Sequence, residues 1–176
     1  MDDPLASSVL ATLENIGQVW STRGAPDVAL DFQGFTAHSP DAPKCDGDDL
    51  WATKACFDSA RPVIDWERGQ LTEALNAGGA MAPAIILARE YGYVMLFSYG
   101  ELLNGTMPAL RAECFAGVYA AAAKDKYPDD GDKSYKAASR GASDVAFSSR
   151  RASAFTTGKS AAERKDAFTA CLKADL

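Results

Sequence analysis

The residues with the clearest chemical potential are two adjacent charged side chains inside an otherwise apolar segment. Arg89 and Glu90 interrupt the apolar run over residues 80–97. A glutamate in such a place can act as a general acid or base, and the arginine supplies a fixed positive charge. The chain contains one histidine, His38. A site built on two or three imidazoles therefore cannot be assembled within a single chain, and any serine–histidine or cysteine–histidine hydrolysis would have to use His38.

The segment around Glu90 can be compared with a motif of zinc hydrolases. In the motif His-Glu-x-x-His, two histidines one helical turn apart bind the metal, and the glutamate activates the bound water. Residues 89–93 read Arg-Glu-Tyr-Gly-Tyr, so the glutamate is kept while Arg89 and Tyr93 stand at the histidine positions. Taken alone, this frame is also typical of a buried helix with one paired Arg–Glu edge.

Longer segments resemble one bacterial family in the same order along the chain. Residues 110–120, Leu-Arg-Ala-Glu-Cys-Phe-Ala-Gly-Val-Tyr-Ala, resemble the Leu-Gln-Ala-Asp-Cys-Phe-Ala-Gly-Val-Trp-Ala stretch of the YpfJ-type neutral zinc metallopeptidases. Residues 19–21, 63–65 and 154–160 resemble the family's Trp-containing helix end, its Ile-Tyr-Leu-Asp strand and its Ser-Phe-Thr-His-Gly-Ser segment. The resemblance covers about residues 19–171 and implies a zincin-like α+β fold, mostly helical with a small β-sheet and stapled by disulfides.

The departures from the family fall on its zinc ligands. The resemblance implies three ligands, namely the two histidines of the helix and a glutamate from a Glu-x-x-Ala-Asp pattern. Those positions hold Arg89, Tyr93 and Ala109 in this chain. The resemblance therefore implies a degenerate active site that has lost its metal, and we expect neither a metal nor another cofactor.

Two acids of the family's site are retained. Glu90 corresponds to the water-activating glutamate, Glu113 corresponds to the acid that steadies a ligand histidine, and the family's later histidine aligns with Thr157. Removing a dication from a pocket lined by carboxylates leaves negative charge without a partner, which costs several kcal/mol. We therefore expect Arg89 to pair with Glu113 or Glu90 across two helices, and the Tyr93 ring to fill the rest of the metal cavity.

The four cysteines allow either a disulfide framework or four reduced thiols. The resemblance favours disulfides between Cys45 and Cys56 and between Cys114 and Cys171, which would be typical of an exported protein. We therefore expect an extracytoplasmic domain, exported or tethered to a membrane, whose signal or anchor is absent from this sequence.

Charge and apolar patterning exclude several partners. The formal net charge of −6 argues against nucleic acid, because phosphate binding needs a basic face. Arg89 and Glu90 interrupt the longest apolar stretch, which predicts a buried helix and no direct insertion of this domain into a membrane.

The spacing of apolar residues and the turn signals predict the elements that position these side chains. Asp3 is the expected N-cap of the first helix, and Phe168 and Cys171 belong to the last. The predicted elements are helices over residues 3–22, 82–99, 106–124 and 135–149, a short helix or turn over 71–76, strands over 28–35 and 62–66, and a terminal helix opened by the capping-box residues 160–163.

These observations predict a single metallopeptidase-like domain over residues 1–176 that is catalytically inactive. We expect this pseudopeptidase to bind a protein or peptide, or to support a membrane complex, in the bacterial cell envelope. The default docking place is the old substrate cleft between the Arg89 helix and the small sheet. Two alternatives remain, namely an enzyme that uses Glu90 in a metal-free mechanism and a metallopeptidase completed by ligands from a partner subunit.

Overall fold

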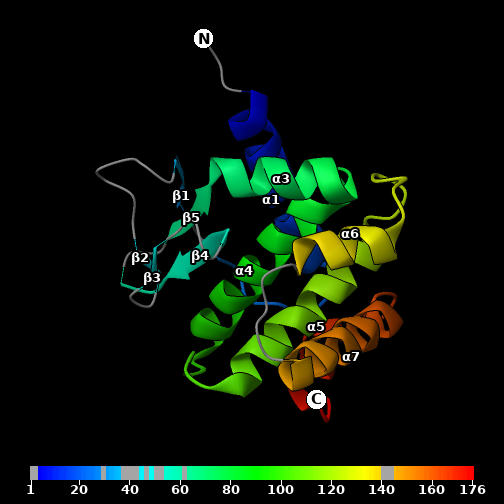
Figure 1. Ribbon diagram of the computed structural model, residues 1–176. Helices are drawn as coiled ribbons and strands as arrows, with labels where there is room; N and C mark the ends of the chain where they lie inside the picture. Colours follow the sequence, from blue (N-terminus) through cyan, green and yellow to red (C-terminus); the bar gives the residue numbers. More distant parts are fainter. Residues whose placement is uncertain are drawn as a thin grey trace.

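Two apolar helices, α4 (Met81–Tyr99) and α5 (Thr106–Ala122), lie side by side at the centre of the computed structural model (Figure 1). The structure describes residues 4–28, 31–36, 44–45, 48–49, 54–60, 63–139 and 145–176. Most side chains of α4 and α5 are buried on every face, as expected for helices without a polar side. Both helices match the predicted ranges within two residues at each end.

Helix α1 (Pro4–Ser21) packs against α4 through the apolar stripe that its sequence predicts. Val9, Leu13, Ile16 and Trp20 recur at helical spacing, and all four are buried. Asp3, the expected N-cap, and His38 lie outside the described residues.

A small sheet beside α4 confirms the α+β class (Figure 1). Its central strand runs parallel to the first strand and antiparallel to the strand before it, in the order β1-β5-β4, and it is buried along its whole length. The two longer strands confirm the predictions, but the four-residue strand β4 was not predicted, because pairing with β5 defines it more than its own pattern does. The described strands are β1 (Asp31–Phe35), β2 (Lys44–Cys45), β3 (Asp48–Asp49), β4 (Ala55–Asp58) and β5 (Val63–Glu67).

Helix α3 (Arg68–Gly78) follows β5 directly and is longer than the helix or turn expected over residues 71–76. The Glu67 side chain accepts a hydrogen bond from the backbone N–H of Gln70 at 2.6 Å and so caps the helix at its first turn.

The prediction of one helix over residues 135–149 is wrong. Helix α6 (Gly131–Ala138) begins earlier, because the Asp130 side chain accepts hydrogen bonds from the backbone N–H groups of Asp132 and Lys133. Helix α7 (Val145–Ala161) then begins at the far end of the expected helix and continues for another twelve residues past its predicted end.

The capping-box prediction at residues 160–163 is also wrong. Ser160 lies inside the last turn of α7, where its hydroxyl donates to the carbonyl oxygen of Thr156. The terminal helix is α8 (Ala167–Lys173), which carries Phe168 and Cys171 as expected but starts four residues after the predicted box. A Ser-x-x-Glu pattern can also fall at the end of a helix, and here α7, which packs on α5, ends at Ala161 within the pattern.

Two glycines set the close contact between α5 and α7. A Cβ atom on Gly158 would overlap the carbonyl oxygen of Cys114, and a Cβ on Gly117 would overlap the carbonyl oxygen of Phe155. Because neither glycine has a Cβ, the two backbones can approach this closely, and α7 covers α5 along its length (Figure 1).

A buried disulfide ties α8 to α5. Cys114 and Cys171 are both fully buried and their Cα atoms lie 5.8 Å apart, which confirms this half of the predicted framework. The other pairing involves Cys45, whose side chain lies outside the described residues; none of the described cysteines is free. Among the described helices, none is long and apolar enough to cross a membrane.

Candidate functional site

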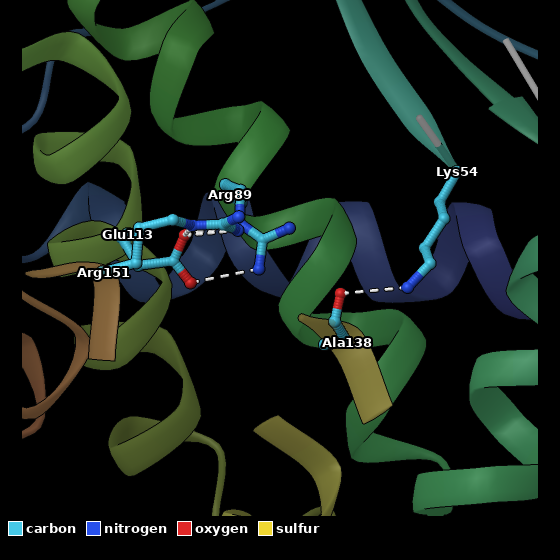
Figure 2. Close-up of polar contacts among 5 residues, drawn as sticks. All are labelled: Lys54, Arg89, Glu113, Ala138 and Arg151. Carbon is cyan, nitrogen blue, oxygen red and sulfur yellow. Dashed lines mark hydrogen bonds and ion pairs between the residues drawn. The ribbon is translucent and has the colours of Figure 1, made fainter. Parts of the chain in front are cut away.

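An ion pair between α4 and α5 lies at the predicted site (Figure 2). Arg89 donates from Nε to Oε2 of Glu113 at 2.8 Å and from Nη2 to Oε1 at 3.0 Å. The Glu113 side chain is completely buried, and 12% of the Arg89 side chain is exposed. The expected pairing of Arg89 with Glu113 is confirmed, in the bidentate geometry that suits a guanidinium and a carboxylate.

Arg151 on α7 is a third member that the sequence did not predict. Its Nε donates to Oε2 of Glu113 at 3.0 Å, so one carboxylate is shared by two guanidiniums (Figure 2). Arg151 lies seven residues before Gly158, two turns away on the same face of α7 that meets α5. The glycine was the available signal, because a helix that approaches α5 there brings Arg151 toward Glu113.

Glu90 lies next to this pair and joins α4 to the sheet. Its Oε2 accepts a hydrogen bond from the backbone N–H of Phe57 on β4 at 3.2 Å, and 8% of the residue is exposed. In an antiparallel pair, opposed residues alternate between those that bond across the strands and those that do not. The backbone N–H of Glu67 on β5 donates to the carbonyl oxygen of Lys54, so Phe57, three residues further along, is a non-bonded position. Its N–H therefore points away from β5 and can reach Glu90. We call Arg89, Glu90, Glu113 and Arg151 the charge cluster.

The electrostatics of the charge cluster leave Glu90 close to half-protonated at neutral pH. Burial raises the pKa of Glu90 to about 7, although the positive charge of Arg89 and the Phe57 N–H bond both favour its ionised form. Burial opposes the charge of Arg89, but the neighbouring Glu113 carboxylate outweighs this and raises the pKa of Arg89. Arg89 therefore stays charged, while the raised pKa of Glu90 lets this carboxyl group gain or lose a proton near neutral pH.

Two tyrosines adjoin the charge cluster. Burial, with a contribution from the negative charge of Glu90, raises the pKa of Tyr93 well above its usual range. Burial and the Glu113 carboxylate raise the pKa of Tyr135 on α6 to about 12, and its ring stacks on Phe155 with 4.1 Å between centroids. Both phenols therefore stay neutral and can act as hydrogen-bond donors.

A lysine at the start of the sheet connects β4 to α6 nearby. The Lys54 Nζ donates to the carbonyl oxygens of Ala137 and Ala138, each at 3.4 Å, at the C-terminal end of α6 (Figure 2). A positive charge at this end favours the helix, because its last carbonyl groups carry partial negative charge.

Ala109 and Thr157, the other two predicted site residues, lie on α5 and α7. Ala109 lies on α5 one turn before Glu113, partly buried, and offers a methyl group where the resemblance implies a ligand. Thr157 is exposed on α7, and its hydroxyl donates to the carbonyl oxygen of Ser153 at 3.0 Å. Thr157 therefore bonds within its own helix, and the face of α7 that meets α5 is formed by neighbouring residues such as Gly158.

The donor set does not fit the zinc ion that the resemblance implies. A guanidinium has no lone pair for a metal and brings its own positive charge, and a methyl group has no donor atom at all. Among the described residues, no group of three His, Cys, Asp or Glu side chains could hold a metal ion. The arrangement instead places fixed positive charge and one titratable carboxyl group at the junction of four elements.

No protein-family model, no curated protein and no solved structure matches this chain. The likeness to the zinc metallopeptidases therefore stays a prediction from the sequence.

Proposed function

We propose that this chain is a metal-free relative of the YpfJ-type metallopeptidases that binds a protein or peptide and does not hydrolyse it. One observation carries the proposal: at the position where the resemblance implies the first zinc ligand, the Arg89 guanidinium makes two hydrogen bonds to Glu113. Its positive charge takes the place that a dication would have beside the retained acid. A buried carboxylate needs such a partner, since an unpaired one is strongly destabilising.

The expected docking face is the side where α4 meets β4. Glu90 contacts Phe57 there, and the ring of Phe57 lies 5.7 Å from that of Phe97, whose residue is 46% exposed. An exposed aromatic side chain beside charged groups is typical of the anchors of protein interfaces. This is the observation that favours binding on this face over support of a complex through another.

The metal test compares the purified chain with a variant in which the three ligand types are restored, Arg89→His/Tyr93→His/Ala109→Glu. Elemental analysis after exposure to zinc should find no stoichiometric metal in the wild type, and zinc in the rebuilt variant. Stoichiometric zinc in the wild type, with chelator-sensitive cleavage of an unstructured protein such as casein, would overturn the proposal and favour a metallopeptidase. If zinc is bound only after a partner subunit is added, the ligands come from that subunit.

A second candidate function is favoured by the position of Glu90, which is 8% exposed beside the arginines, since burial there raises its pKa to about 7. A carboxyl group that titrates near the working pH is suited to general acid–base catalysis, and Tyr93 could serve as a neutral donor beside it. The discriminating variant is Glu90→Gln, compared with wild type for complementation of a deletion in the native host. Loss of function with an unchanged fold favours metal-free catalysis, and retained function favours binding.

An oxidising location belongs to the same proposal. The buried Cys114–Cys171 disulfide is typical of proteins outside the reducing cytosol. We place the domain in the bacterial envelope, exported or tethered to a membrane. Alkylation of intact cells before lysis tests this, because two blocked thiols at Cys114 and Cys171 in a non-reduced sample would contradict it.

A further inference from the structure

We propose that the charge cluster binds the C-terminal carboxylate of a peptide whose last side chain is apolar and lies against Phe97. The inference rests on the proposed function, because it names the chemical group that is recognised on the same face. It follows from three observations: the unused donors of the arginines, the charge balance of the cluster, and the order of side chains along α4.

The two guanidiniums have donors left for a second anion. Arg89 and Arg151 both direct Nε and Nη2 to Glu113. Within the described part of the chain, neither arginine has another hydrogen-bond acceptor, so the Nη1 groups remain available. The side chains are 12% and 15% exposed, so both reach solvent. Two guanidinium groups that share one carboxylate form a site where a second carboxylate can accept hydrogen bonds from both.

The charge balance favours an anion. Two guanidiniums face the single carboxylate of Glu113, so the cluster carries one uncompensated positive charge whenever Glu90 is protonated. The groups that face Glu90 are Arg89 and Tyr93 on its own helix, the Phe57 N–H from β4, Glu113 from α5 and Arg151 from α7. An incoming carboxylate repels ionised Glu90 but can accept a hydrogen bond from the neutral acid. Binding is therefore coupled to the uptake of a proton by Glu90.

The order of side chains along α4 indicates which carboxylate fits. Arg89, Glu90, Tyr93 and Phe97 follow at spacings of one, three and four residues, which places them on one face of the helix. Phe97 at the end of this row is 46% exposed and contacts the ring of Phe57. A negative group next to an apolar side chain on one and the same residue is what the end of a peptide with an apolar last residue presents, whereas an internal apolar residue has no main-chain carboxylate.

The test uses the oxidised full chain and two blocked peptides, acetyl-Ala-Ala-Phe with a free carboxylate and the same peptide with a C-terminal amide. Because hydrogen bonds to charged groups are strong, isothermal titration near pH 6 should show at least about tenfold tighter binding of the acid. The Nε–Hε signals of Arg89 and Arg151 should shift in the ¹H–¹⁵N spectrum with the acid and not with the amide.

Two variants locate the site. Arg151→Gln removes one fork but keeps the Arg89–Glu113 pair, and it should weaken binding of the acid by about tenfold. Arg111→Gln on α5 is the matched control, because Arg111 pairs with Glu101 at 3.0 Å away from the cluster and the change should leave binding unchanged. If Arg151→Gln fails to fold, the acid–amide comparison on the wild type decides alone.

The coupling to Glu90 gives a further readout. Binding of the acid should weaken between about pH 6 and about pH 8 in the wild type, and Glu90→Gln should remove most of this change. Equal affinity for acid and amide, or binding of neither, would overturn carboxylate recognition. Equal affinity for the peptide acid and the peptide amide would still agree with the proposed peptide binding. That proposed function is overturned by a different result, stoichiometric zinc in the purified wild type. If phenylacetate alone binds as tightly as the peptide acid, the ligand is a small organic acid and the peptide source is wrong.

Discussion

Replacing Glu113 by glutamine should destabilise the chain strongly, because it leaves two guanidiniums without their shared carboxylate. Glu113 is completely buried and accepts hydrogen bonds from Arg89 at 2.8 and 3.0 Å and from Arg151 at 3.0 Å. Breaking a buried ion pair by removing one partner costs about 3–5 kcal/mol. For a domain of this length, that corresponds to a fall in Tm of roughly 6–20 °C.

The measurement is urea unfolding followed by circular dichroism, with Glu101→Gln as the matched control. Glu101 makes a similar contact with Arg111 at 3.0 Å, but 33% of its side chain is exposed. Because exposed pairs contribute little, the control should lose less than about 1 kcal/mol.

Removing all three charges of the triad should restore stability. Replacing the whole triad, as Arg89→Met/Glu113→Leu/Arg151→Met, should bring the free energy of unfolding back to within about 1–2 kcal/mol of the wild type at about pH 5, where Glu90 is protonated, because none of the triad's three charges then remains buried. A Glu113→Gln loss no larger than that of Glu101→Gln would refute the argument and show that the two arginines are stabilised by solvent instead.

Three further predictions concern the pH dependence, the disulfide and the helix contact. Burial raises the pKa of Glu90 from 4.5 to about 7, so the folded state holds the extra proton between these values, and the free energy of unfolding should fall by about 3 kcal/mol as the pH rises through them. Urea titrations should find that Glu90→Gln lacks this fall, and parallel curves for variant and wild type would contradict it. Cys114→Ala/Cys171→Ala opens a crosslink across 57 residues and should cost about 4 kcal/mol by thermal or urea unfolding; an unchanged midpoint would show that the bridge adds nothing. Gly158→Ala should destabilise the chain because its Cβ overlaps a backbone carbonyl of α5, whereas Gly131→Ala, with open space around it, should be neutral in the same assay.

The sequence predicted those helices and strands that depend on residues close together in the chain, and it missed boundaries that depend on tertiary contacts. The stripe of Val9, Leu13, Ile16 and Trp20 needs one buried side and so predicts α1 without reference to the rest of the chain. The boundaries near residues 131–161 were wrong, because the cap at Asp130 and the contact at Gly158 decide them. A single side chain and a contact with α5 outweighed the apolar spacing used for the prediction.

The candidate site shows the same division. The pair of Arg89 and Glu113 could be anticipated, because the resemblance implies a buried acid without its metal, and such an acid needs another cation beside it. The exposure of Thr157 could not be anticipated, because a close approach at Gly158 orients the face of α7 that meets α5, and the segment's likeness to a histidine-containing one does not.

By itself the sequence determined the class of fold, the central apolar helices, the Cys114–Cys171 bridge and the absence of any imidazole at the Arg89 helix. These follow from residue types, their spacing and one resemblance. The tertiary structure alone decided that Arg151 shares Glu113 and that Glu90 binds the edge of the sheet. The reason is physical: both contacts join residues more than thirty positions apart, and the pKa of Glu90 depends on the burial and charges that those contacts create.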